Sequence, residues 1–230
     1  SRVYSMFTFR GKLYASGELS VFKSGKFVNT HLMRYDGSGK ATVIHMDKAN
    51  AMFPGHAAKL ETDGLRMERT VEHQNRLIYL GAFVENGNQW QAVAAFTATE
   101  IGQAKAIALP AGMQPWDILI GEDGRAYILG AIRRAKGDFE NIVVASSDLE
   151  TWEPILTFKA PTFARSFEML DGQFYFGLGV STGELSDASG RILRVALPAQ
   201  KDSTPTPTPA PTPTPTPKPT ATPTPTPRSC

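Results

Sequence analysis

The sequence of 230 residues contains one cysteine, Cys230, and lacks long apolar runs. A single cysteine cannot form an internal disulfide, so a fold held together by disulfides is excluded. No apolar run approaches the roughly 18 residues that a membrane-spanning helix requires. The charges nearly cancel, with 24 basic and 22 acidic residues. This balance gives no electrostatic footprint for nucleic acid or for an anionic membrane surface, so we expect neither as a partner.

Metal and cofactor motifs are also missing. The glycine-bearing segments "GEDG" and "GLGVSTG" have no strand-to-helix context, which a phosphate-binding loop requires. With one cysteine and no His-Glu-x-x-His spacing, a zinc site is not expected either. We therefore expect no metal and no cofactor. The four histidines without metal-ligand spacing are His31, His45, His56 and His73.

Proline is scarce in the first 200 residues and abundant after them, because eleven of the seventeen prolines lie beyond Thr204. The alternating Pro-Thr stretch 204–227 has no apolar side chains to bury, so it predicts an extended polyproline II rod of about 3.1 Å per residue, roughly 75 Å in all. We therefore divide the chain into a folded domain, 1–200, and a linker, 201–230. Threonines in a proline-rich setting are typical of O-glycosylated stalks. Those that we expect to carry sugars are Thr204, Thr206, Thr208, Thr212, Thr214 and Thr216.

The rod resembles the Pro-Thr linkers of secreted bacterial polysaccharide-degrading enzymes, which join a catalytic domain to a carbohydrate-binding or anchoring module. The resemblance implies a secreted or cell-surface protein tethered to another domain, and the alternative is a solvated spacer without a partner. The chain has no initiating Met and no leader, so we expect any signal peptide to have been removed or to lie upstream. Cys230 either joins a second chain or marks where a longer protein was cut, and we favour the cut.

The folded part contains a repeat. Four segments share a polar turn followed by an apolar strand that ends in small residues: "FRGKLYASG", "HQNRLIYLGA", "EDGRAYILGA" and "LDGQFYFGLG". If Tyr14, Ile78, Tyr127 and Tyr175 are equivalent, the spacings are 64, 49 and 48 residues. Apolar residues alternate with period two, which indicates strands. Several short strands per unit of about 40 to 50 residues predict an all-β fold, a β-propeller of four-stranded antiparallel blades.

The blades are predicted at 1–47, 65–110, 114–160 and 163–198, with an inserted loop at 47–64 that carries a short helical turn. The fourth blade offers only three strands before the tail. Since an open sheet edge is a liability, either the native chain has further blades upstream, which we favour, or this is a four-bladed ring with a frayed last blade. In both cases the closing strand is absent here or comes from another chain.

The segment "SSDLETW" lies on the last hairpin of the third blade. It resembles a degenerate Asp-box, the Ser-x-Asp-x-Gly-x-Thr-Trp turn of sialidases and related propellers. Ser146, Asp148, Thr151 and Trp152 match in type, but the glycine is replaced and the loop is one residue short. In that family the turn is structural and lies away from the catalytic face. We expect Asp148 to accept hydrogen bonds from nearby backbone amides and Trp152 to pack between blades.

Candidate site residues follow from the repeat, because propeller sites lie where the first residues of the inner strands converge. Counting back ten positions from each equivalent residue gives Tyr4, Glu68, Asp117 and Arg165, and their neighbours add Arg2, Arg66 and Trp116. Carboxylates and arginines can bind hydroxyl or acid groups, and aromatic faces stack on sugar rings. We therefore favour glycan binding. The alternative is a wet channel lined with polar residues that bind no ligand.

Two further functions stay open. Glycoside hydrolysis needs two carboxyl groups flanking the bond, and Glu68 and Asp117 are the pair available. A sialidase-like enzyme adds arginines for the substrate carboxylate and a tyrosine nucleophile, roles that the resemblance gives to Arg66, Arg165 and Tyr4. The other possibility is a structural subunit that completes its open fourth blade by exchanging a strand with a neighbouring copy.

Overall fold

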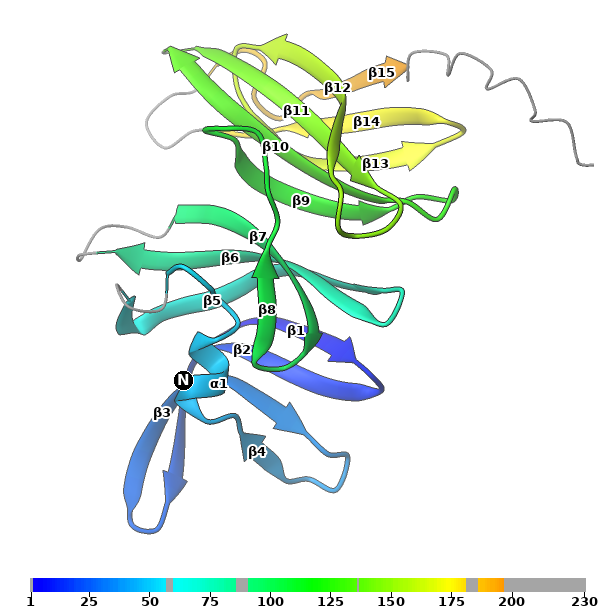
Figure 1. Cartoon of the computed structure of the whole chain (residues 1–230). Helices are drawn as coiled ribbons and strands as arrows, with labels where there is room; N and C mark the ends of the chain where they lie inside the picture. Colours follow the sequence, from blue (N-terminus) through cyan, green and yellow to red (C-terminus); the bar gives the residue numbers. More distant parts are fainter. Residues whose placement is uncertain (1, 57–59, 86–90, 136, 181–185, 197–230) are drawn as a thin grey trace, which may run out of the picture. The chain divides into compact units, whose positions relative to one another are not determined.

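Four antiparallel sheets follow one another along the chain, from the blue first sheet to the yellow and orange fourth (Figure 1). The computed structural model describes residues 2–56, 60–85, 91–135, 137–180 and 186–196. Within these residues the only helix is α1, Met46–Asn50, and the first three sheets have four strands each in sequential order. The prediction of an all-β propeller with four-stranded antiparallel blades is confirmed.

The first blade consists of β1 Arg2–Phe9, β2 Lys12–Lys23, β3 Lys26–Tyr35 and β4 Ala41–Val43. The second consists of β5 Leu60–His73, β6 Arg76–Glu85, β7 Gln91–Glu100 and β8 Gln103–Ala106. The third consists of β9 Gln114–Ile120, β10 Ala126–Ala135, β11 Asp138–Ser146 and β12 Glu153–Ala160. In the fourth, β13 Ala164–Leu170, β14 Gln173–Leu178 and β15 Ile192–Ala196 form a sheet of three described strands.

Tight hairpins set the register of the inner strands. In the first blade, Phe9 pairs with Lys12 across the two-residue turn Arg10-Gly11, and both turn residues have positive φ, 49° and 68°. This is the geometry of a type I′ turn, whose twist matches that of the flanking strands. The second and fourth blades have the same kind of turn at 74–75 and 171–172. The third blade differs, because its turn is the longer segment 121–125.

Apolar side chains pack between consecutive blades. One cluster joins residues of the first two blades and includes the fully buried Phe9, Tyr79 and Phe96. A second cluster joins the second and third blades, and a third, which includes Tyr127 and Phe174, joins the third and fourth. The inner strands β1, β5, β9 and β13 contact one another in turn. The interfaces thereby bring equivalent positions of neighbouring inner strands close together.

The structure departs from the predicted strands in the first blade. Strands β2 and β3 continue beyond the sheet as a two-stranded arm, in which Leu19 pairs with Thr30 and Lys23 with Lys26. At its tip the rings of Phe22 and Phe27 meet edge to face at 5.2 Å and are 65% and 75% exposed. The repeated segment "FRGKLYASG" ends at Gly17, so the repeat did not predict the arm. The predicted helical turn in the inserted loop is α1, although β5 begins at Leu60, inside the predicted loop.

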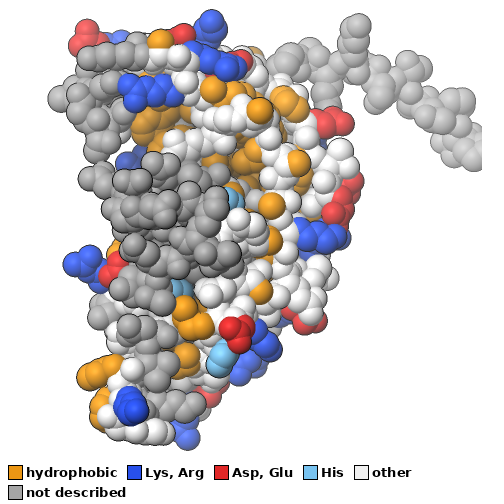
Figure 2. Space-filling view, turned by 60° about the vertical axis from the view of Figure 1, so that its left-hand side comes forward, with side chains coloured by type: hydrophobic (Ala, Val, Ile, Leu, Met, Phe, Trp, Pro, Cys, Tyr) orange, Lys and Arg blue, Asp and Glu red, His pale blue; other side chains and the backbone are white. Residues whose placement is uncertain are grey.

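Strand β15 is the outermost described strand of the fourth blade, and Ile192 at its start is 76% exposed. Strand exchange at this edge stays a prediction. The Pro-Thr rod and its six candidate glycosylation threonines lie outside the described residues. On the face drawn in Figure 2, acidic and basic side chains are interspersed among hydrophobic ones over the part that the structure describes. The helix α1, with five residues, is far too short to span a bilayer, and no longer helix occurs in that part of the chain.

Candidate functional site

Each inner strand contains a β-bulge at an equivalent place, and β5 has a further register shift between Leu60 and Leu65. In the first blade Val3 pairs with Gly17 and Ser5 with Ser16, so Tyr4 has no partner in the β1–β2 register. A bulged residue is left out of the ladder and its side chain is re-aimed, which is why bulges recur beside functional sites. The bulged residues of β1, β5, β9 and β13 are Tyr4, Glu68, Trp116 and Arg165.

A glycine on the second strand accompanies each bulge. Gly81 pairs with Met67, immediately before the bulge at Glu68, and Gly130 pairs with Pro115 in the same way. A Cβ atom on Gly130 would lie 2.6 Å from the carbonyl oxygen of Gln114, so the bulged strand approaches too closely for a side chain. The glycine that recurs in the sequence repeat is therefore part of the bulge.

The four bulged side chains converge on one pocket of about 190 Å³. It is lined by Tyr4, Arg66, Glu68, Arg69, Trp116 and Arg165. Five of these six residues are among those predicted from the sequence. Arg69 was missed, although it follows Glu68 directly in "RMER". Each blade thus contributes one residue from its bulge, and the second blade adds the two arginines that flank Glu68.

Arg66, Glu68 and Tyr4 form a connected group on one wall of the pocket. The Arg66 guanidinium donates to Glu68 Oε1 at 2.5 Å and lies over the Tyr4 ring, 4.5 Å from its centre. The Tyr4 hydroxyl donates to Glu18 at 2.7 Å. The Arg66 and Glu68 side chains are only 17% and 31% exposed. An ion pair and a cation–π contact therefore restrain these side chains in one arrangement.

Trp116 and Arg165 form another part of the lining. One face of the Trp116 indole stacks on Phe163 at 4.3 Å between ring centres, with 22° between the planes. Phe163 is buried, so the stacking anchors the indole to the fourth blade. Arg165 is exposed, at the bulge of β13. Of the other predicted residues, Arg2 is exposed on β1 and Asp117 lies on β9, and neither lines the pocket.

The count of ten positions back from Tyr127 misses the bulge of the third blade by one residue. The bulged residue of β9 is Trp116, and Asp117 pairs in register with Leu129. Both carboxylate oxygens of Asp117 are engaged. Oδ1 accepts from the backbone N–H of Ile118 at 3.0 Å and pairs with Arg69 Nε at 3.2 Å, and Oδ2 accepts from the N–H of Phe167 at 3.3 Å. Burial raises the pKa of Asp117, and these partners oppose the rise.

The longer hairpin turn of the third blade explains this shift. Where the turn has two residues, Tyr14, Ile78 and Tyr175 pair with residues seven positions before them. Across the turn 121–125, Tyr127 pairs with Leu119, eight positions back. A constant count of ten therefore reaches the bulge in three blades and misses it by one residue in the third.

The turn predicted around Asp148 has the expected hydrogen bonds. Asp148 Oδ1 accepts from the backbone N–H groups of Glu150 and Thr151, both at 2.8 Å, and from the Ser146 hydroxyl at 3.0 Å. These donors lower the pKa of Asp148 to about 2. Trp152 packs against the apolar cluster between the second and third blades. The turn is thus a structural element, and its relation to the Asp-box stays a resemblance.

Histidines and acidic residues do not form a metal site in the described residues, where no cluster of three or more metal-ligating side chains occurs. Three histidines have other contacts. His45 pairs with Asp47 at 3.3 Å, the His56 ring meets Phe96 edge to face, and His73 Nε2 donates to the carbonyl of Gly124 at 2.9 Å.

No protein-family profile matches this sequence, and no curated protein matches it. Distant similarity to solved structures is found. An α-L-arabinofuranosidase from Clostridium thermocellum is 14% identical, with a TM-score of 0.41 over 82% of this chain and 66% of that one. An exo-β-1,3-galactanase from Clostridium thermocellum is 14% identical, with a TM-score of 0.44 over 82% and 47% of the two chains. A β-1,3-galactosidase is 11% identical, with a TM-score of 0.43 over 84% and 75%. This chain thus spans less than two thirds of the length of the first two, and likeness at this distance carries no argument about function.

Proposed function

We propose that this protein is an extracellular glycan-binding module and that the pocket at the four bulges holds the sugar. The observation that carries the proposal is the convergence of Tyr4, Glu68, Trp116 and Arg165, one residue from the same structural position in each blade. Repeated positions that each present a different polar or aromatic side chain make a site with several distinct contacts. Such a site suits a ligand with many hydroxyl groups.

The chemistry of the lining favours a sugar that carries an acid group. Three guanidinium groups, on Arg66, Arg69 and Arg165, line the pocket with the carboxylate of Glu68. Asp117 pairs with Arg69 from outside the lining, so the formal balance is 3 − 2 = +1. Guanidinium groups bind carboxylates through paired, charge-assisted hydrogen bonds. The Trp116 indole offers an apolar surface for a sugar ring. Polar and charged groups around an aromatic surface therefore point to an acidic oligosaccharide as the ligand.

The Pro-Thr stretch supports an extracellular location for this module. Its proline content predicts a spacer of about 3.1 Å per residue, roughly 75 Å in all, which would hold a binding domain away from the part to which it is joined. Sugars on the linker threonines would stiffen and protect it, as in other stalks of this composition. The rod then acts as a tether between the glycan-binding domain and another domain or an anchor.

The test is a binding measurement with two oligosaccharides of equal length, tetragalacturonate as the acidic ligand and cellotetraose as the neutral one. We expect tetragalacturonate to bind to the full chain and Arg165→Ala to weaken binding at least about tenfold, since a hydrogen bond to a charged group is worth about 1.5–3 kcal/mol. Arg194→Ala is the matched control, because Arg194 is exposed on β15 of the same blade and does not line the pocket. Binding that is equally weakened by both variants, or unchanged by both, would contradict the proposal.

Glycoside hydrolysis by Glu68 and Asp117 is the second candidate. One observation favours it, since burial raises the pKa of Asp117, as a general acid requires. Against it, Asp117 does not line the pocket and both its oxygens have partners. Release of reducing ends from the bound oligosaccharide, abolished by Glu68→Gln with thermal stability unchanged, would replace binding with hydrolysis as the function. Binding without release supports the binding module.

A further inference from the structure

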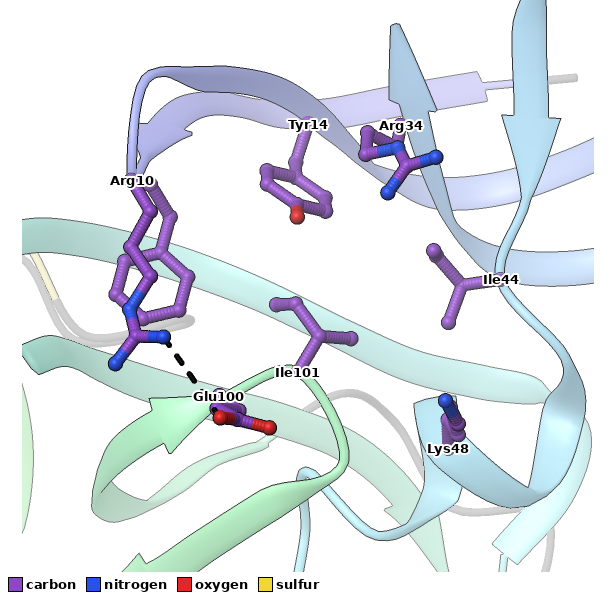
Figure 3. Close-up of a pocket in the computed structure, with 8 residues that line it drawn as sticks. Arg10, Tyr14, Arg34, Ile44, Lys48, Glu100 and Ile101 are labelled. Carbon is purple, nitrogen blue, oxygen red and sulfur yellow. Dashed lines mark ion pairs between the residues drawn. The ribbon is translucent and has the colours of Figure 1, made fainter.

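A second pocket, of about 260 Å³, lies on the first two blades and shares no residue with the glycan pocket (Figure 3). Its polar lining comes from four separate places in the chain. Arg10 lies in the β1–β2 turn, Arg34 on β3, Lys48 on α1 and Glu100 at the end of β7. The short helix α1, part of the insertion between the first two blades, thus supplies one wall.

Positive charge predominates in this pocket. Three cationic side chains face it with one carboxylate, which gives a formal balance of 3 − 1 = +2. The carboxylate of Glu100 lies 3.8 Å from the Arg10 guanidinium, the ion pair drawn as a dashed line in Figure 3. A pair at this distance, with both side chains about half exposed, neutralises only part of the charge. Glu100 is the one carboxylate among the described residues that line the pocket, and it pairs with Arg10 rather than with Arg34 or Lys48.

Arg34 is a cation of this pocket whose hydrogen-bonding capacity the protein does not fully use. Its Nε atom is buried and donates to no acceptor among the described residues. A buried donor without an acceptor costs about 1–3 kcal/mol, and more when it belongs to a charged group. Arg34 is held in place from both sides, because its backbone pairs with Tyr14 on β2 and with Thr42 on β4. Figure 3 shows the end of the Arg34 guanidinium pointing into the pocket, so its terminal nitrogens can donate to an anion there.

The remaining walls limit the kind of anion. Phe9, Ile44 and Ile101 are apolar, and Phe9 is only 1% exposed. The Tyr14 hydroxyl points into the pocket between Arg10 and Arg34 in Figure 3. A volume of about 260 Å³ is below the roughly 300–1,000 Å³ typical of pockets for drug-sized ligands. The lining therefore suits a compact organic body with one acidic group, rather than a long polyanion.

We propose that this pocket is a binding site for a small molecule that carries a carboxylate or a phosphate, of the size of one monosaccharide. Arg34 and Lys48 bind the acidic group, with Arg10 at the rim, and the apolar walls and Tyr14 contact the body. Guanidinium groups match both oxyanions in geometry. The site does not depend on the glycan-binding function, because it is formed by other residues.

The experiment is calorimetric titration of the full chain with glucuronate, glucose 6-phosphate and glucose. We expect at least one of the two acidic sugars to bind and glucose not to bind. Binding of glucuronate alone would assign a carboxylate ligand, and binding of glucose 6-phosphate alone a phosphate. Affinity should fall as the salt concentration rises, since screening weakens the contacts. If neither acidic sugar binds, or if glucose binds equally well, the proposal is wrong.

Three variants and a control identify the pocket. Arg34→Gln and Lys48→Ala should each weaken binding about tenfold or more, as expected for loss of a charge-assisted hydrogen bond. Glu100→Gln should strengthen binding severalfold, because it removes the opposing charge. The control is Lys40→Ala, which removes an exposed charge of the first blade outside the pocket. A gain in affinity on removing Glu100 cannot come from damage to the fold, so tighter binding supports the site, while unchanged binding in all three variants overturns it.

Discussion

Asn141 provides a sharp test of how the third and fourth blades are joined. This side chain is fully buried on β11, and its Oδ1 accepts from the backbone N–H of Ala164 at 2.6 Å. Its Nδ2 donates to the carbonyl of Thr162 at 3.4 Å. Thr162 in turn donates from its hydroxyl to the carbonyl of Gly179 at 3.0 Å. A single buried amide therefore links the third blade to the segment that leads into β13, where Phe163 and Arg165 lie.

The cost of removing this amide can be worked out from these contacts. Asn141→Ala leaves the N–H of Ala164 buried without an acceptor, which costs about 1–3 kcal/mol. The long bond to Thr162 adds little. We therefore expect the free energy of unfolding to fall by about 2 kcal/mol. In a domain of this size that corresponds to a decrease in Tm of roughly 4–8 °C.

Urea denaturation followed by Trp fluorescence measures the change. Thr157→Ala is the control, because Thr157 is exposed on the neighbouring strand β12 and its truncation should change stability by less than about 0.5 kcal/mol. A loss below about 0.5 kcal/mol for Asn141→Ala would refute the reasoning, since it would mean that the buried N–H finds another acceptor. A loss matched by the control would refute it as well, because the effect would not be specific to the amide.

Two further predictions concern the bulge and the Asp148 turn. A Cβ atom on Gly81 would lie 2.7 Å from the Phe96 ring and 2.8 Å from the Phe53 ring. We therefore expect Gly81→Ala to lower the free energy of unfolding by about 1–3 kcal/mol, measured by thermal unfolding. Gly124→Ala is the comparison and should cost less, because Gly124 has positive φ but open space around it. The folded-state pKa of Asp148, about 2, lies below its usual value of 3.8, so its contribution to stability is present above pH 3.8 and is lost as the pH falls toward 2. Asp148→Ala should lower the free energy of unfolding at pH 7 and reduce its dependence on pH between about 4 and 2, as measured by acid unfolding. An unchanged pH dependence in the variant would contradict the lowered pKa of Asp148.

The fold was predictable because a blade is a local structure. Each hairpin joins strands that are adjacent in sequence, so the period-two pattern and the turn residues are enough to predict it. The second strands, marked by Tyr14, Ile78, Tyr127 and Tyr175, all have the predicted role. The arm at 19–30 was not predictable from the repeat, since only the first blade has it.

Five of the six residues that line the candidate site were predictable, whereas Arg69 was missed and the predicted Arg2 and Asp117 do not line the pocket. A common offset from the repeat found Tyr4, Glu68 and Arg165, because three blades have the same two-residue turn. In the third blade the offset reached Asp117, and Trp116 was included only as its neighbour, since a fixed offset does not account for a longer turn. No sequence pattern predicted the second pocket. Arg10, Arg34 and Lys48 come from unrelated positions of the sequence, and only the packing of the first two blades brings them together.

The four bulges also affect how such a protein can change over time. A bulged residue makes no ladder pair, so its side chain can be replaced without loss of a cross-strand partner, while the glycine opposite preserves the backbone. Tyr4, Glu68, Trp116 and Arg165 occupy four such positions, each on a different sheet and far apart in sequence. A change in one blade leaves the hairpins of the other three intact. The four side chains can therefore vary independently of the hairpins, and a substitution costs only the contacts of that side chain, such as the stacking of Trp116 on Phe163.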